Sequence, residues 1–140
     1  MRKKTPRVKP KNDAYWVEPE YKKHVIAWCR CYKRWKYRLM DLRNSLRGIN
    51  YDKDRVQTSG DYDQTADVAV KCEELEKKIR LLEDTARKVS PDMYFWIIKG
   101  VTDEYVTVQE LIQQGMPCSR NTYVRMTDKF YYLLSREIEI

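Results

Sequence analysis

Few side chains in this sequence could bind a metal or attack a substrate, and they lie far apart along the chain. His24 is the only histidine, and no base is placed beside a serine or cysteine to activate it as a nucleophile. His24 and Cys31 lie seven residues apart, on one face of a predicted helix. A zinc site would need two further ligands within reach of them. The sequence therefore predicts no structural zinc.

Two other patterns also fall short of a metal or phosphate site. Four aspartates flank a predicted loop, but without the glycine and closing glutamate of a calcium loop: Asp52, Asp54, Asp61 and Asp63. They are expected to form turns and to place negative charge at a helix N-terminus. With only four glycines in the chain, no phosphate-cradling loop is expected. We expect a protein that is not an enzyme and binds no metal or cofactor.

The residue types that remain suit recognition of a polyanion. Arg and Asn pair well with guanine and adenine edges, and Thr suits a phosphate or a thymine methyl group. Such residues lie on the outward side of a helix that is predicted to begin after Ser119. The candidate DNA-binding residues are Arg120, Asn121, Thr122 and Arg125, with Lys129 one turn later.

Positive charge gathers in the N-terminal third of the chain. Residues 20–47 carry nine bases against two acids, whereas residues 48–140 carry 13 bases against 17 acids. The candidate polyanion-binding residues are Arg2, Lys3, Lys4, Arg7, Lys9 and Lys11 of an N-terminal arm, and Arg30, Lys33, Arg34 and Arg38. This surface faces either a polyanion, most simply nucleic acid, or only solvent.

The elements that must position these residues are helices. Apolar residues alternate in four- and three-residue steps from Tyr21 to Leu46, and again from Val68 to Val89. Such a stripe keeps one face of a helix against a partner helix. The residues between the stripes have a turn composition. The pattern predicts one long helix over 19–47 and a second over 61–89, folded back as an antiparallel hairpin.

The last fifty residues change pattern. Ser90 and Pro91 start one predicted helix, Thr107 caps a short helix over 108–114, Gly115 ends it, and Ser119 caps the last. Three helices with a glycine turn before the longest one are typical of a helix-turn-helix. The other interpretation is a small helical cap with a polar solvent face, since residues 90–140 hold five bases and seven acids.

We therefore expect an all-α protein with three parts: a basic arm (1–18), an antiparallel helical hairpin (19–89) and a helix-turn-helix module (90–140). All four cysteines, Cys29, Cys31, Cys72 and Cys118, are expected to be reduced thiols in a cytoplasm. No apolar run approaches the roughly 18 residues of a membrane span. The basic start is not followed by an apolar stretch, so we expect no secretory signal and no membrane partner.

Several of these features together resemble a known family. The hairpin, the link Asp54-Arg55-Val56-Gln57-Thr58-Ser59-Gly60 and the endings 118–123 and 129–134 are similar to ArpU/RinA-like late transcription regulators of bacteriophages and prophages. The resemblance covers roughly residues 20–137. It implies a phage regulator in a bacterial host cell, with a sigma-factor-like helix-turn-helix that binds promoter DNA, and host RNA polymerase as a further partner. It also implies that the reading helix begins at Ser119.

Two functions remain open at this point. The first is a transcriptional regulator that binds duplex DNA, or another nucleic acid, through residues 119–129, with phosphate contacts from the arm and the first helix. The alternative is an inhibitor whose basic hairpin occupies a nucleic-acid channel of a host enzyme, a CRISPR nuclease or RNA polymerase. A regulator should prefer one DNA sequence, whereas an inhibitor should bind its protein target with little need for DNA.

Overall fold

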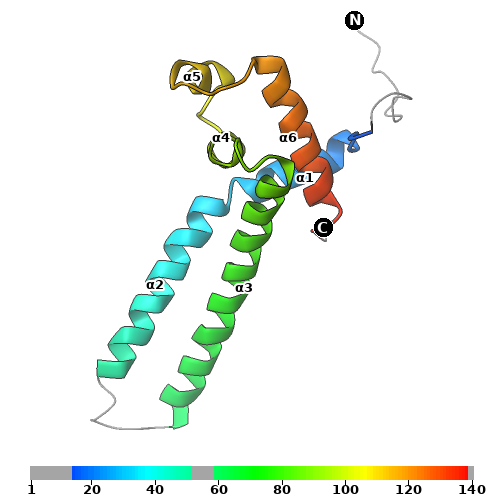
Figure 1. Cartoon of the computed structure of the whole chain (residues 1–140). Helices are drawn as coiled ribbons and strands as arrows, with labels where there is room; N and C mark the ends of the chain where they lie inside the picture. The colour runs from blue at the N-terminus through cyan, green and yellow to red at the C-terminus, as the bar shows by residue number, and fades with distance from the viewer. Residues whose placement is uncertain (1–13, 52–58, 139–140) are drawn as a thin grey trace, which may run out of the picture. The chain divides into compact units, whose positions relative to one another are not determined.

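The computed structural model describes the backbone of residues 14–51 and 59–138. It describes the side chains of the same residues except those of 47–51 and 59–64. The six basic residues of the arm, and all of the 54–60 link except its last two residues, lie outside this description. The regular structure of the described residues is entirely helical, which confirms the predicted all-α class (Figure 1). The helices are α1 (Pro19–Cys29), α2 (Tyr32–Tyr51), α3 (Ser59–Val89), α4 (Tyr94–Val101), α5 (Val108–Gln113) and α6 (Arg120–Ser135).

The chain divides into two compact units. The first contains the segment up to Cys31 together with residues 82–140, and so holds α1, the end of α3, and α4 to α6. The second contains residues 32–81, which are α2 and most of α3. The apolar stripe of the first half of the sequence is therefore shared between two cores.

The single helix predicted over 19–47 is wrong, because a turn at Arg30 and Cys31 separates α1 from α2. The Arg30 amide still donates to the Ile26 carbonyl, but the Cys31 amide donates to Trp28, only three residues back. Neither proline nor glycine lies at this point. The break coincides with a change of packing partner, since α1 packs on α6 whereas α2 belongs to the other unit.

The second unit buries one face of each of its helices. Tyr32, Trp35 and Leu39 of α2 are buried, as are Cys72, Leu75 and Ile79 of α3, in agreement with the predicted stripes. Polar contacts between the helices include the pair of Arg43 with Glu76, and the Lys78 ammonium, which lies 5.7 Å from the centre of the Trp35 ring. Figure 1 shows α2 and the first part of α3 side by side.

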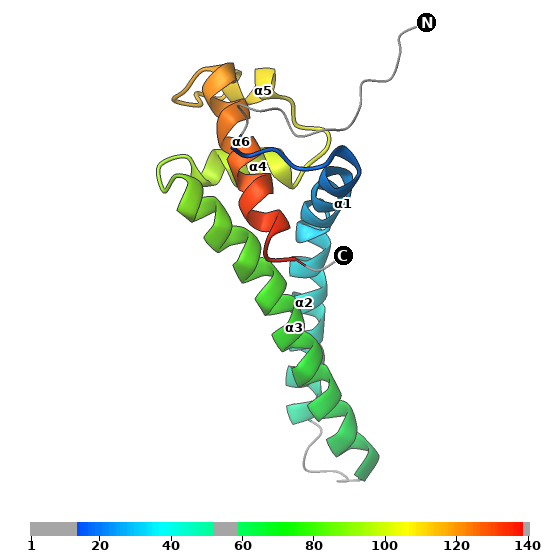
Figure 2. The ribbon, with the colours of Figure 1, turned by 90° about the vertical axis from the view of Figure 1, so that its right-hand side faces the viewer.

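In the first unit, α4, α5 and α6 contact one another pairwise. Their buried side chains include Ile97 and Val101 of α4, Leu111 of α5, and Phe130 and Leu134 of α6. Figure 2 shows α5 at the N-terminal end of α6. Each of these helices therefore contributes apolar residues to one core.

The predicted boundaries of α5 are nearly correct. The Thr107 hydroxyl accepts a hydrogen bond from the Glu110 amide at 3.2 Å, and α5 then runs for six residues. Gly115 follows with φ of 100°, a left-handed conformation that glycine adopts without steric cost. This turn reverses the chain toward α6.

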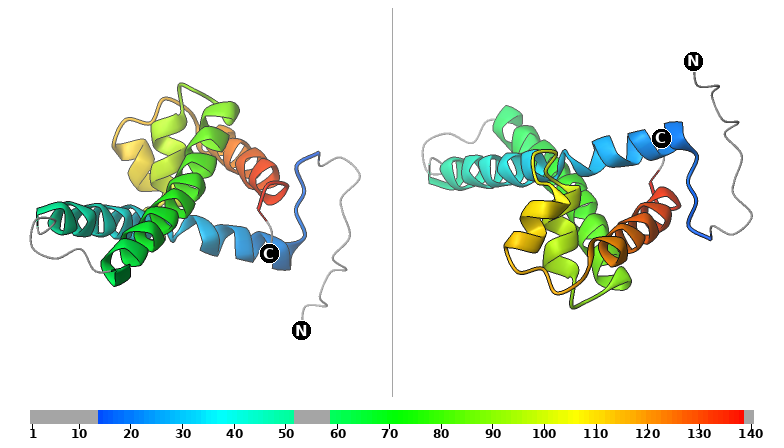
Figure 3. Two further views of the ribbon diagram at one scale, coloured as in Figure 1. Left: turned by 90° about the horizontal axis from the view of Figure 1, so that it is seen from below. Right: turned by 90° about the horizontal axis from the view of Figure 1, so that it is seen from above.

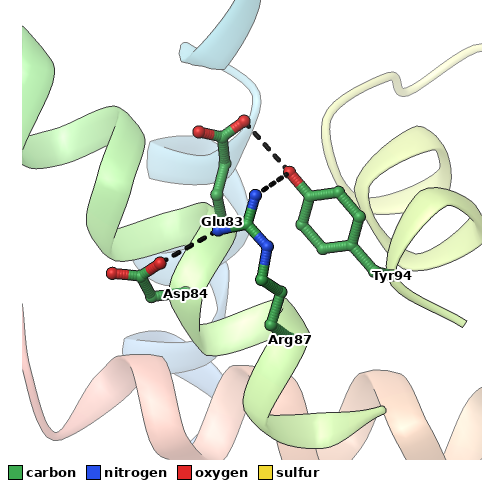
Figure 4. Close-up of polar contacts among 4 residues, drawn as sticks. All are labelled: Glu83, Asp84, Arg87 and Tyr94. Carbon is green, nitrogen blue, oxygen red and sulfur yellow. Dashed lines mark hydrogen bonds and ion pairs between the residues drawn. The ribbon is translucent and has the colours of Figure 1, made fainter. Parts of the chain in front are cut away.

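The turn before α4 is held by polar contacts (Figure 4). The Tyr94 hydroxyl donates to Glu83 at 3.1 Å, and Arg87 donates to the same hydroxyl at 3.4 Å while pairing with Asp84 at 3.0 Å. The Ser90 hydroxyl accepts from the Met93 amide. Regular helix begins only at Tyr94, a few residues after the predicted start, because Ser90 caps this turn rather than the helix itself.

Helix α1 packs along α6. The Tyr21 hydroxyl lies within hydrogen-bond distance of two backbone carbonyls at the C-terminal end of α6, those of Ser135, its last residue, at 2.8 Å and Ile138 at 3.0 Å, and its single proton is shared between them. Val25 and Cys29 of α1 are fully buried. Figure 3 shows the end of α6 close to the start of α1. The first helix of the sequence therefore supports the last one.

Candidate nucleic-acid interface

The N-terminus of α6 is built by a local cap. The Ser119 hydroxyl accepts a hydrogen bond from the Thr122 amide at 3.3 Å and donates to the Thr122 hydroxyl at 3.0 Å. Ser at this position satisfies an amide that the helix leaves without a partner. Thr122, a predicted DNA-binding residue, is half-buried and its hydroxyl is used in the cap. In the cap, this hydroxyl helps to orient the helix start.

The first two turns of α6 present an open face. Arg120, Asn121 and Arg125 are exposed, and Val124 between them is 42% exposed. Tyr123 points the other way and is buried. Val124 was not predicted as a site residue, although its position beside Asn121 and Arg125 on a helical wheel gives the signal. The face combines two guanidinium groups, an amide and a small apolar group.

The outward side of the second half of α6 is occupied by side chains from the start of the chain. Lys22 of α1 forms an ion pair with Asp128 at 3.1 Å. The Lys129 ammonium lies 5.8 Å from the centre of the Tyr15 ring, and Tyr15 packs edge-on against Tyr132 at 5.6 Å. Lys129 is half-buried by this arrangement. The open face of α6 is therefore limited to residues 120–125.

A groove lies where α1 meets α6. It has a volume of about 350 Å³, and its lining includes Tyr15, Trp16, Lys22, Lys23 and Asp128. Lys23 is well exposed, whereas Lys22 offsets the charge of Asp128. Sequence alone gives no signal for the Lys22–Asp128 pair, because 106 residues separate the two side chains.

The described members of the predicted polyanion-binding set are divided between the two units. Arg30 belongs to the first unit, where it approaches Glu104 at 3.7 Å. Lys33, Arg34 and Arg38 are exposed on α2, in the second unit. Only Arg30 therefore shares a unit with α6, and the bases of the arm lie outside the described residues.

Burial raises the pKa of three ionisable groups, one on α1 and two on α6. Burial raises the pKa of the Cys29 thiol and of the neighbouring Tyr131 hydroxyl well above their ordinary values. Burial also raises the pKa of Tyr123 to about 12. Such groups are poor nucleophiles at neutral pH, since the thiolate and not the thiol reacts. Their place in the core points to packing rather than catalysis.

Within residues 14–51 and 59–138, no three His, Cys, Asp or Glu side chains are grouped closely enough to hold a metal ion. All four cysteines are free thiols. No helix in the described part of the chain is long and apolar enough to cross a membrane.

The comparisons with protein families, curated proteins and solved structures find no match for this chain, so the resemblance to ArpU/RinA-like regulators rests on the residues that carry it.

Proposed function

We propose that this protein is a non-enzymatic phage-type transcriptional regulator that binds duplex DNA through the first turns of α6. The observation that carries the proposal is the open face of Arg120, Asn121, Val124 and Arg125 on one well-supported helix start. In a helix-turn-helix, it is the first turns of the last helix that enter the major groove. We interpret α4, α5 and α6 as that element, and α2 with α3 as its hairpin.

The chemistry of the face suits direct readout of bases. Arg makes two hydrogen bonds to guanine, Asn makes two to adenine, and an aliphatic group such as that of Val124 can contact a thymine methyl. Four such side chains within two turns match the few residues that a reading helix normally uses. The N-terminal arm and the exposed Lys23 of α1 would add phosphate contacts that carry no sequence information.

Residues 90–140 carry more acids than bases, which disfavours DNA binding by this segment alone. The packing of α1 on α6 makes the unit less acidic. The Lys22 ammonium pairs with Asp128, the acid nearest the open face on α6. Arg30 approaches Glu104 in the same way. Because α1 adds bases to this unit, the charge that DNA meets is less negative than that of the C-terminal segment alone.

The proposal is tested by selecting bound duplexes from a random pool and comparing the full chain with an Arg120→Ala, Arg125→Ala double variant. We expect the full chain to enrich one sequence, and the double variant to lose that preference while keeping weak salt-sensitive binding. Lys88→Ala, which removes an exposed base elsewhere in the same unit, is the matched control. Enrichment that survives the double substitution would refute readout by α6. The inhibitor alternative expects no enriched sequence from any variant.

A further inference from the structure

Helix α2 exposes two large apolar side chains that its own core does not use. Tyr37 is 67% exposed and Met40 is 51% exposed. Both lie away from the line of Tyr32, Trp35 and Leu39, which are buried. Residues three apart on a helix lie on the same side, so Tyr37 and Met40 form one exposed apolar strip. An exposed apolar strip on a rigid helix is a feature of interaction sites.

Met40 also borders a groove within the second unit. The groove has a volume of about 350 Å³, and its lining combines apolar and polar side chains: Leu39, Met40 and Ile79 with Lys36, Arg43 and Asn44. We call this groove, together with Tyr37, which precedes Met40 by three residues on α2, the α2 groove. The groove can accept an apolar side chain of a partner, and the flexible side chain of Met40 can adapt to the shape of that side chain.

Helix α2, which supplies most of the lining of this groove, carries an excess of positive charge. From Tyr32 to Leu46, α2 carries five bases, which are Lys33, Arg34, Lys36, Arg38 and Arg43, against the single acid Asp41. Arg43 is matched by Glu76 of α3, but Lys36 contacts the ring and hydroxyl of Tyr32, which carry no charge. A ligand of this surface therefore needs apolar groups for the strip and negative charge for its surroundings.

A nucleic-acid backbone meets only half of that requirement. Phosphate contacts gain from Lys and Arg, but they leave an aliphatic side chain such as Met40 without a matching group. An interface between helices uses both, since apolar anchors three or four residues apart fill a groove while charges at the rim set the partner. Tyr, Met and Arg are also enriched at protein interfaces.

From these observations we infer that the α2 groove binds an acidic amphipathic helix of another protein. Apolar residues of that helix pack on Tyr37 and Met40, and its carboxylates face Lys36 and its basic neighbours. A second copy of this chain is a weaker match, because two acids that α3 exposes are already paired within α3, Asp67 with Lys71 and Glu73 with Lys77. This surface is separate from the residues proposed to read DNA.

The test uses the full chain and a fluorescein-labelled helical peptide of about three heptads, with leucine on one face and glutamate elsewhere. A second peptide carries lysine in place of glutamate. We expect fluorescence anisotropy to show binding of the glutamate peptide only, with affinity that falls as salt rises. A Tyr37→Ala, Met40→Ala double variant should bind it about tenfold more weakly, and so should Lys36→Glu.

Matched controls separate this surface from the rest of the molecule. Val70→Ala removes an exposed apolar side chain from α3 of the same unit, and should bind the peptide as the unchanged chain does. The Arg120→Ala, Arg125→Ala variant should also bind the peptide as the unchanged chain does. Loss of DNA readout and loss of peptide binding can then be distinguished. Thermal melting confirms that each variant is folded.

Four results would overturn the inference. The first is peptide binding that the Tyr37→Ala, Met40→Ala substitutions leave unchanged. The second is equal binding of both peptides, which would make the surface merely apolar. The third is self-association of the unlabelled chain, in sedimentation, that these substitutions abolish, which would make a second copy the occupant. Displacement of the peptide by random duplex DNA, with DNA affinity unaffected by the apolar substitutions, would reassign the surface to phosphate.

Discussion

The Tyr123 hydroxyl of α6 lies where a side chain on Gly100 of α4 would begin. A Cβ atom built on Gly100 would overlap that hydroxyl and lie 3.0 Å from Tyr123 Cζ and 3.3 Å from Leu111 Cδ1. Gly100 therefore lets α4 approach the helix that we propose reads DNA. Gly is a poorer helix former than Ala, and Gly100 lies in the last turn of α4, so the close approach explains its presence there.

We expect Gly100→Ala to lower the free energy of unfolding by about 1–3 kcal/mol, because the overlap outweighs the better helix propensity of alanine. Tyr123→Phe removes the atom that the new methyl group meets first. Combined with Gly100→Ala, it should recover part of the loss, measured by chemical denaturation of the four members of the cycle. Strict additivity of the two substitutions would show that the contact does not determine the packing of α4 on α6.

Arg125 and Lys129 should differ in how they affect DNA binding. Arg125 stands on the open face, so Arg125→Ala should cost roughly 1–3 kcal/mol with the preferred duplex and relax its preference at one or two base pairs. Lys129 lies over Tyr15, so Lys129→Ala should weaken all sequences alike and only slightly. Titrations against preferred and random duplexes measure both. Equal losses on the two duplexes for Arg125→Ala would contradict its role in readout.

The negative charge of Asp128 should oppose DNA binding, even though the ion pair with Lys22 offsets part of that charge. Its side chain is 43% exposed, so Asp128→Asn removes a negative charge near the proposed interface and releases Lys22 for phosphate. We expect tighter binding at low salt and a salt dependence steeper by about one ion. The melting temperature should hardly change, because an exposed ion pair contributes only about 0–1 kcal/mol. Asp92→Asn, at an exposed position before α4, is the control, and an equal gain there would point to net charge alone.

Stability should decline at alkaline pH because of Cys29. Its thiol is buried and its folded pKa lies above the ordinary value of 9.0. Below that value both states are neutral, and above it the unfolded chain loses the proton first, so the free energy of unfolding falls by up to about 1.4 kcal/mol per pH unit. Cys29→Ala should flatten this decline between about pH 9 and 10, whereas Cys31→Ala should preserve it. If chemical denaturation shows that the free energy of unfolding of Cys29→Ala falls equally steeply with pH, groups other than Cys29 cause the decline.

The sequence by itself determined the elements whose signals are local. Ser119 and Thr107 cap their helices through hydrogen bonds to amides three residues on, and Gly115 takes the left-handed conformation that ends α5. The four- and three-residue spacing gave the buried apolar residues in the middle of α2 and α3, because side-chain direction on a helix follows directly from position, but it did not give the buried Thr85, and the stripe residues nearest the helix ends, such as Val68 and Val89, are only half-buried. The all-α class follows from the same periodicity.

The tertiary structure alone decided which helix packs on which. The stripe of the first helix continues unbroken through Arg30 and Cys31, but its two halves serve different cores, and the turn between them has no local cause. The Lys22–Asp128 pair and the Tyr15–Lys129 contact join residues more than 100 positions apart, and together they limit the open face of α6 to its first turns. Neither contact has a sequence signal, because a periodic stripe specifies that a face is buried and not which partner buries it.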